Sequence, residues 1–178
     1  MTPQELKELV RTIPDFPIKG IQFRDITTLI GDGDGFAATV DWLAARVRQS
    51  GAEAIAGMEA RGFIFGAAVA AKLALPFLPV RKSGKLPCET ISVDYALEYG
   101  SDRLELDPAS VRQGQRVAMV DDLLATGGTA CATAKLLRQA GAVVDHAFFV
   151  IDLPDLGGAA KLAKVGVAVA ALMDFEGD

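Results

Sequence analysis

The sequence predicts an α/β fold with a mainly parallel, twisted sheet flanked by helices. Three observations predict it: short apolar runs alternate with segments of helical periodicity, glycines and prolines separate them, and no internal repeat interrupts the pattern. The 178 residues are enough for a sizeable core, and 51% hydrophobic with 23% charged residues is typical of a globular protein. We expect one domain over residues 1–178, with residues 1–30 as an appendage.

The chain is predicted to begin with a helix. Thr2 can cap it, Pro3 suits a first turn, and Glu5 completes a capping box. The apolar stripe that follows has helical spacing as far as Ile13, and Pro14 ends it. Residues 16–30 then form an irregular stretch with short β-like runs.

From residue 31 onward, loops, helices and strands follow in a regular order. Residues 31–35 are glycine-rich and predict a helix-capping turn, which leads to a helix that Gly51 ends. The predicted helices cover residues 36–49, 62–73, 127–139 and 156–164. The predicted strands cover residues 54–58, 77–80, 116–120, 143–151 and 167–173. Between them, residues 82–92 predict a mobile loop, and residues 93–97 with 104–106 predict a hairpin.

Composition excludes several classes of function. A net charge of −5 argues against a nucleic-acid surface, although a local cluster of cations could still bind a small anion. Two cysteines in no CxxC pattern indicate a reducing compartment, and the single His146 excludes most zinc sites and histidine triads. The first residues do not resemble a signal peptide, and no apolar run could span a bilayer, so we expect a cytoplasmic protein without membrane contact.

Charged residues follow the predicted strands. In open α/β sheets, ligands bind outside the carboxyl ends of the strands. The residues at those ends are Glu59 to Arg61, Arg81 with Lys82, Asp121 with Asp122, and Asp152. One interpretation is that exposed strand ends are simply charged. The other is that cations and carboxylates gather at one edge of the sheet to hold a ligand.

Residues 117–129, VAMVDDLLATGGT, carry the most information. A hydrophobic strand ends in two acids, and a short loop with threonines and glycines then opens a helix. Backbone N–H groups at a helix start attract phosphate, and glycine lets the backbone come close. The two carboxylates could accept from adjacent sugar hydroxyls, with Mg²⁺ nearby. The segment is neither a Walker A loop nor a GxGxxG turn, and the alternative is a capped helix after a strand.

This segment resembles the motif of the type I phosphoribosyltransferases that binds 5-phosphoribosyl-1-pyrophosphate (PRPP). Its amino-acid sequence is similar to that of the adenine-specific branch of the family. Four further stretches resemble family motifs in the same order: residues 16–26 (FPxxGxxFRDI), 59–63 ([DE][AS]RGF), 81–87 (RKxGKLP) and 97–100 (LEYG). The resemblance therefore implies a type I phosphoribosyltransferase domain, in which residues 1–30 form a hood over the base and residues 82–107 a flexible lid.

The resemblance also implies roles for individual residues. Asp121 and Asp122 would contact the ribose hydroxyls, while Ala125, Thr126, Gly127, Gly128 and Thr129 would cradle the 5′-phosphate. Pyrophosphate would be held by Glu59, Ala60 and Arg61, with a non-proline cis peptide, and by Arg81, Lys82 and Lys85. Adenine would be bound by Gln22 and Arg24, largely through backbone atoms, with Phe23 and Leu123 packing against it.

The implied reaction transfers the 5-phosphoribosyl group from PRPP to adenine, giving AMP and pyrophosphate. Bond breaking at C1 would pass through an oxocarbenium-like state, with Mg²⁺ held mainly through PRPP and Asp121 and Asp122 nearby. Glu98, from the lid, would lie over the base and the anomeric carbon as the catalytic residue. Closure of the lid would exclude water. The family also implies a homodimer, in which Arg81 can serve a neighbouring site.

Three alternatives remain open from sequence. The first is a phosphoribosyltransferase for another purine, such as hypoxanthine or xanthine. The second is a PRPP-sensing regulator, which predicts a DNA-binding segment or basic face and a damaged lid glutamate, whereas Glu98 is present. The third is an interaction protein without a ligand, and the charged residues at strand ends argue against it.

Overall fold

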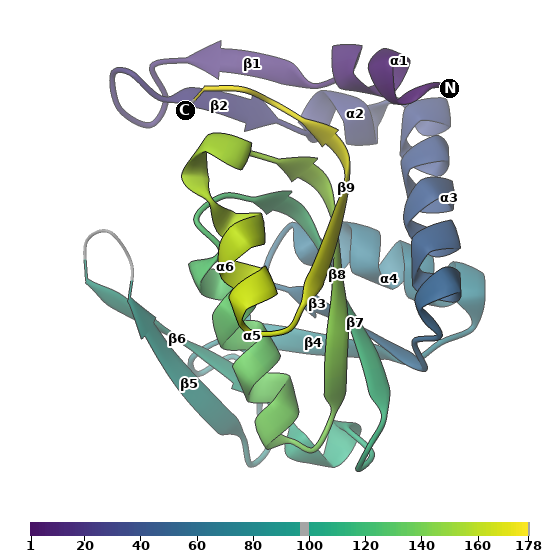
Figure 1. Ribbon diagram of the computed structural model, residues 1–178, viewed down its shortest axis with the longest axis vertical. Helices are drawn as coiled ribbons and strands as arrows, with labels where there is room; N and C mark the ends of the chain where they lie inside the picture. Colours follow the sequence, from purple (N-terminus) through teal and green to yellow (C-terminus); the bar gives the residue numbers. More distant parts are fainter. Residues whose placement is uncertain (97–99, 178) are drawn as a thin grey trace.

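A seven-stranded sheet organises the protein in a computed structural model, which describes residues 1–96 and 100–177. The strand order is β5-β6-β4-β3-β7-β8-β9 (Figure 1). The strands are β3 (Ala54–Met58), β4 (Phe77–Lys82), β5 (Ile91–Ala96), β6 (Ser101–Leu106), β7 (Arg116–Leu124), β8 (Val143–Asp152) and β9 (Ala168–Asp174). Strands β4, β3, β7, β8 and β9 run parallel, and the β5–β6 hairpin joins β4 antiparallel. The predicted fold class is confirmed.

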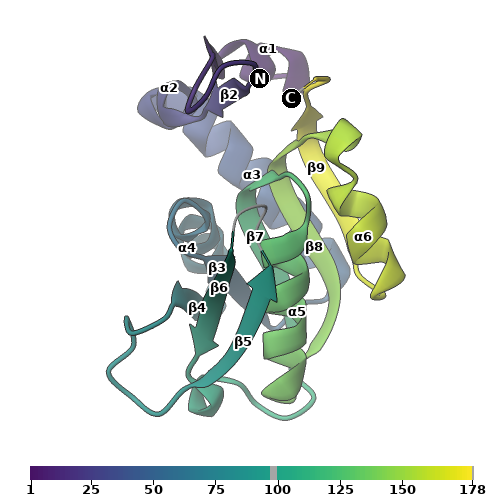
Figure 2. The ribbon, with the colours of Figure 1, turned by 90° about the vertical axis from the view of Figure 1, so that its left-hand side faces the viewer.

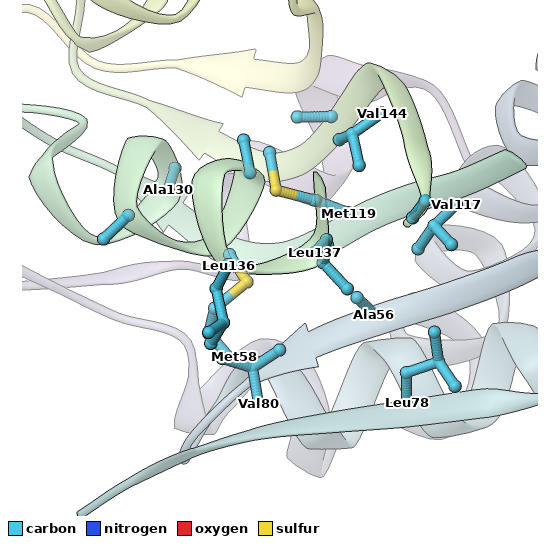
Figure 3. Packing of buried hydrophobic residues seen from close by; sticks show 14 of the residues in the cluster. Ala56, Met58, Leu78, Val80, Val117, Met119, Ala130, Leu136, Leu137 and Val144 are labelled. Carbon is cyan, nitrogen blue, oxygen red and sulfur yellow. The ribbon is translucent and has the colours of Figure 1, made fainter. Parts of the chain in front are cut away.

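Helices cover both faces of the sheet (Figure 2). Helices α3 (Gly33–Ser50) and α4 (Gly62–Leu73) lie on one face, and α5 (Gly128–Gln139) and α6 (Gly158–Lys164) lie on the other. Each face has its own buried apolar cluster. Figure 3 shows one of them, in which Leu136 and Leu137 of α5 point toward Met58 and Ala56 of β3. Burial on both faces explains why β3 is apolar along its whole length.

The N-terminal region forms a separate small layer above the carboxyl end of the sheet (Figure 1). It contains α1 (Pro3–Glu8), β1 (Arg11–Pro14), β2 (Gln22–Asp25) and α2 (Thr27–Gly31). The capping box of Thr2 and Glu5 is confirmed. The predicted extension of the first helix to Ile13 is wrong, because Ile13 lies in β1 opposite Phe23 of β2. Pairing of β1 with β2 here outweighs the local helical spacing.

Most other boundaries agree with the prediction within three residues. Helix α4 matches it at both ends, and Gly51 ends α3 with a left-handed φ of 69°. The largest difference is at β7, which continues through Leu124 because residues 121–124 still pair with β8. The two acids therefore lie within the strand rather than after it. No helix in the described part of the chain is long and apolar enough to cross a membrane.

Candidate active site

A cavity of about 310 Å³ lies at the carboxyl ends of β3 and β7. It is lined by Glu59, Ala60, Arg61, residues 121–130 and Phe149. These residues come from two parallel neighbours in the sheet, whose ends meet at one edge. The structure thus brings together two of the predicted groups, the one at residues 59–61 and the one at residues 121–129.

At the end of β3, Glu59 organises the cationic side of the site. Its carboxylate accepts from the backbone N–H of Lys82 at 3.0 Å, and from Nε and Nη2 of Arg81 at 3.2 and 3.3 Å. These contacts hold the pKa of Glu59 below its usual range, first through the Lys82 N–H and then through Arg81. The Glu59–Ala60 peptide is cis, as the resemblance implied. Glu59 therefore fixes the end of β4 relative to this turn.

Two adjacent carboxylates define the opposite wall of the cavity. Asp122 is buried, and its Oδ2 lies 2.9 Å from Nε of Arg61. Asp121 accepts the backbone N–H of Asp122 at 2.9 Å, and burial, with the charge of Asp122, raises the pKa of Asp121 well above its usual range. A Cβ at Gly62 would lie 2.6 Å from Oδ1 of Asp121, so a larger residue here would displace that carboxylate. The two acids therefore lie beside Arg61, which caps α4.

The turn between β7 and α5 has the geometry expected of a phosphate-binding loop. Gly127 caps α5 with a left-handed φ of 79°, which favours glycine. A Cβ there would lie 3.0 Å from Cα of Gly158, the first residue of α6. Conversely, a Cβ at Gly158 would lie 2.3 Å from the carbonyl oxygen of Ala125. The two helix starts are thus packed backbone against backbone, and the N–H groups at a helix start favour an anion.

The N-terminal layer reaches the cavity through Phe23. The guanidinium of Arg61 lies 5.7 Å from the centre of the Phe23 ring, and Phe16 packs edge-on against the same ring at 5.1 Å. Gln22 and Leu123 are half-buried, and Leu123 lines the cavity. The β1–β2 layer therefore covers the side of the site where the carboxylates and Arg61 meet.

The side chain of Arg24 is engaged away from the cavity. It donates from Nη1 to Oγ1 of Thr12 at 2.7 Å and from Nη2 to the carbonyl of Glu176 at 3.2 Å. Its guanidinium also stacks 4.6 Å from the Phe175 ring. Any contact of this residue with a base would therefore come from its backbone, which is how the sequence-based hypothesis assigned it.

Several predicted residues, Lys82 among them, do not line the cavity. Arg81 bonds to Glu59 of its own chain and to the carbonyl of Lys85, and the Lys85 side chain does not line the cavity. Asp152 ends β8 between Leu124 of β7 and Asp174 of β9, and it does not line the cavity. Burial, together with the charge of Asp174, raises the pKa of Asp152. The predicted catalytic residue Glu98 lies outside the described residues.

Sequence reasoning missed two parts of the site. Phe149, which lies opposite Asp121 in the β7–β8 pairing, forms part of the cavity wall, and nothing in its apolar run distinguished it. The C-terminal segment had been given no role, yet Phe175 and Glu176 hold Arg24. An aromatic residue placed after the last strand is too weak a signal to predict that contact.

The donor set fits a magnesium ion only if a ligand completes it. Among the described residues, no three histidine, cysteine or acidic side chains form a metal-binding group. Asp121 and Asp122 supply two adjacent carboxylates, and the buried Oδ2 of Asp122, although it lies 2.9 Å from Nε of Arg61, accepts no hydrogen bond. Mg²⁺ commonly binds through one or two carboxylates together with substrate phosphates. The residues therefore suit a metal that arrives on a phosphorylated substrate.

Comparison with known proteins points to one family. Residues 28–165 match the family described as phosphoribosyl transferase domain. The adenine phosphoribosyltransferase of Novosphingobium aromaticivorans is 66% identical over 177 residues, which cover 99% of each chain. The adenine phosphoribosyltransferase of Sphingopyxis alaskensis is 59% identical over 98% of this chain and 95% of its own.

Solved structures give the same result. The adenine phosphoribosyltransferase of Thermoanaerobacter pseudethanolicus has a TM-score of 0.93 at 48% identity, covering 98% of this chain and 100% of its own. The enzyme of Saccharomyces cerevisiae, solved with adenine and an imino-altritol bisphosphate, has a TM-score of 0.90 at 36% identity, covering 96% and 97% of the two chains.

Proposed function

The chain belongs to the phosphoribosyltransferase family, and from this we infer that it is an adenine phosphoribosyltransferase. It transfers the 5-phosphoribosyl group of PRPP to adenine, giving AMP and pyrophosphate, which is a purine salvage reaction. The observation that carries this conclusion is the single cavity in which a cationic turn, two carboxylates and a phosphate-binding helix start face one another. PRPP has the matching order of groups: pyrophosphate, ribose hydroxyls and 5′-phosphate.

We propose that PRPP binds along this order. The 5′-phosphate accepts from the backbone N–H groups and threonine hydroxyls of residues 125–129. The carboxylates of Asp121 and Asp122 accept from the ribose 2′- and 3′-hydroxyls. The pyrophosphate lies over residues 59–61, with Arg81, Lys82 and Lys85 supplying positive charge. Ligand charge would then replace part of the Arg61–Asp122 pairing seen in the structure.

Adenine binds between the hood and the cavity in this proposal. Backbone groups of Gln22 and Arg24 bind the base edge, because the Arg24 side chain is already bound to Thr12 and Glu176. Phe23 and Leu123 pack against the faces of the base. This arrangement places the attacking ring nitrogen near C1 of the ribose, and holding both reactants in one orientation accounts for a large part of the barrier reduction.

Glu98 is proposed to act on the reacting atoms. It lies in sequence between β5 and β6, the hairpin that projects next to the start of α5 (Figure 1). As the C1–oxygen bond to pyrophosphate breaks, positive charge develops on the ribose ring, and a carboxylate stabilises it. The same group can take the proton that the attacking adenine nitrogen loses. When bound with PRPP, Mg²⁺ would neutralise pyrophosphate charge, with Asp121 and Asp122 nearby.

The remaining features belong to the same proposal. Residues 1–178 act as one domain, with residues 1–30 as the hood and residues 82–107 as the lid. The enzyme is a homodimer in the cytoplasm and uses neither nucleic acid nor membrane. Sedimentation at working concentration tests the dimer, and a mass of one chain would reject it.

The deciding experiment is AMP formation from adenine, PRPP and Mg²⁺, with hypoxanthine and guanine in parallel. We expect turnover with adenine alone, and a loss of about 100-fold or more in kcat for Glu98→Ala, since an acid–base group typically contributes on the order of 100- to 10,000-fold. Glu89→Gln, an exposed acid in the loop before the hairpin, is the control. Turnover with another base would keep the chemistry and change the substrate. PRPP binding without turnover would favour a sensor.

A further inference from the structure

One carboxylate outside the cavity connects three elements of the proposed site. Asp102 lies in β6, and its Oδ2 is 3.1 Å from Nζ of Lys82 at the end of β4. The same oxygen accepts from the hydroxyl of Tyr95 at 3.3 Å, across the β5–β6 pair. Oδ1 accepts from the backbone N–H of Arg103 at 2.8 Å. Both oxygens are thus used, and the side chain is only 25% exposed.

The hairpin also packs against the phosphate-binding helix. Tyr95 is partly buried against the apolar cluster that contains Ala130 of α5, and this burial raises the pKa of its hydroxyl. A Cβ at Gly128 would lie 3.7 Å from the carbonyl oxygen of Ala96. The hairpin base therefore lies against the start of α5.

We propose that Asp102 is a positioning residue for phosphoribosyl transfer, which fixes the hairpin, and with it Tyr95 at the start of α5, relative to Lys82. The inference rests on the proposed function, in which Lys82 meets pyrophosphate, the start of α5 meets the 5′-phosphate and the hairpin sequence contains Glu98. A single carboxylate links Lys82 to the hairpin that packs on α5. Misplacement by about 1 Å can cost on the order of 100-fold in rate, so such a link would matter for turnover.

If Asp102 acted only through its charge, its removal would have a different effect on PRPP binding and on kcat. A carboxylate 3.1 Å from a pyrophosphate-binding lysine repels an anionic ligand and competes with it for that lysine. Removing the charge would then tighten PRPP binding and leave kcat unchanged. A positioning role predicts instead that kcat falls and that PRPP binding does not improve. The two quantities therefore separate the two explanations.

The test compares Asp102→Asn with Asp94→Asn in steady-state AMP formation. Both positions lie in the same hairpin, and both pair with a cation, but Asp94 faces Arg103 in solvent at 2.6 Å and touches nothing in the site. We expect kcat to fall about 10-fold or more for Asp102→Asn with no decrease in the KM for PRPP, and to stay within about 2-fold for Asp94→Asn. Tyr95→Phe, which keeps the ring, is expected to show a smaller loss of kcat.

A double-mutant cycle identifies the partner. If Asp102 acts through Lys82, adding Asp102→Asn to Lys82→Met costs less than it does in the wild type. Fully additive losses, an unchanged kcat in Asp102→Asn, or a lower KM for PRPP without loss of kcat would each overturn the positioning role. If the wild type makes AMP and the variants give one of these outcomes, only the positioning role of Asp102 is rejected. A wild type that makes no AMP rejects the proposed function, and this inference with it.

Discussion

Nε of Arg61 lies 2.9 Å from Oδ2 of Asp122, and this ion pair joins the end of β3 to the end of β7 across the cavity. The arginine side chain is 45% exposed and the aspartate 6%, so one partner can move while the other stays buried. The same guanidinium lies over the Phe23 ring of the hood. The Arg61 side chain therefore links the acidic wall of the cavity to the hood.

We predict that Arg61→Lys is not a conservative change. A lysine retains the charge, but it has no planar group that can stack on Phe23 while its charge pairs with Asp122. Because a desolvated cation–π contact contributes about 2 kcal/mol, kcat/KM for PRPP should fall on the order of 10-fold or more. Arg48→Lys, an exposed change near the end of α3, should leave it unchanged. Equal values for wild type and Arg61→Lys would show that charge alone is required.

The order of strands and helices was predictable because burial on two faces imposes apolar runs. The predicted bounds of β3 and α4 equal the observed ones for this reason, because both segments are apolar almost from end to end. The cavity-lining residues at 59–61 and 121–129 could be singled out because charged residues or paired acids follow an apolar strand there. These two segments lie close together because β3 and β7 are parallel neighbours in the sheet.

Long-range pairing explains what sequence could not predict. Residues 11–14 have the spacing of a helix end, and only pairing with residues 22–25 makes them a strand. Phe175 lies 151 positions from Arg24 in the chain, 175 − 24, and no local pattern connects them. Asp152 follows a strand as the other acids do, yet the position of β8 places it beside Asp174 instead of the cavity. Each case depends on tertiary contacts that periodicity does not contain.

The hood should lose stability when Asp25 is neutralised. Its pKa is lowered to about 2, chiefly by hydrogen bonds from the Thr27 side chain and N–H, with a further contribution from Arg11. A carboxylate with a lowered folded pKa stabilises the protein above the unfolded value, and this contribution is lost as the pH falls from about 4 to 2. We expect Asp25→Asn to lower the free energy of unfolding by about 1–2 kcal/mol at pH 7.

Urea unfolding from pH 7 to pH 3 measures this effect. The difference between wild type and Asp25→Asn should be constant down to about pH 5 and shrink below pH 4. Asp41→Asn, which removes an exposed ion pair with Lys72, should change stability by less than about 0.5 kcal/mol. A difference that persists at pH 3 would mean that shape rather than charge accounts for it.

Phe23 should affect the binding of adenine more than the binding of PRPP. Its ring packs against Phe16 and beneath the Arg61 guanidinium, and such aromatic contacts contribute about 0.5–1.5 kcal/mol each beyond area burial. Phe23→Leu should therefore raise the KM for adenine about 3- to 10-fold with little change in the KM for PRPP. Ile18→Ala, an exposed residue of the same layer, is the control. A larger effect on PRPP would indicate that Phe23 acts through Arg61.

Two glycines allow backbone strain to be separated from phosphate binding. Gly127 and Gly157 both cap a helix, with φ of 79° and 73°. A Cβ at Gly127 would lie 3.0 Å from Gly158, whereas nothing lies within 4 Å of a Cβ at Gly157. Alanine at either position has the cost of a left-handed conformation, about 1–2 kcal/mol. Only Gly127→Ala should also displace the start of α5 and raise the KM for PRPP, by about 10-fold or more.

Thermal unfolding and PRPP kinetics of the two variants check this expectation together. Both should lower Tm by several degrees, because about 1 kcal/mol corresponds to roughly 2–4 °C in a chain of this length. The KM for PRPP should rise in Gly127→Ala alone. If it rises equally in Gly157→Ala, the effect is a general loosening of the two helix starts. If it rises in neither, the 5′-phosphate does not depend on the close packing of Gly127 against Gly158.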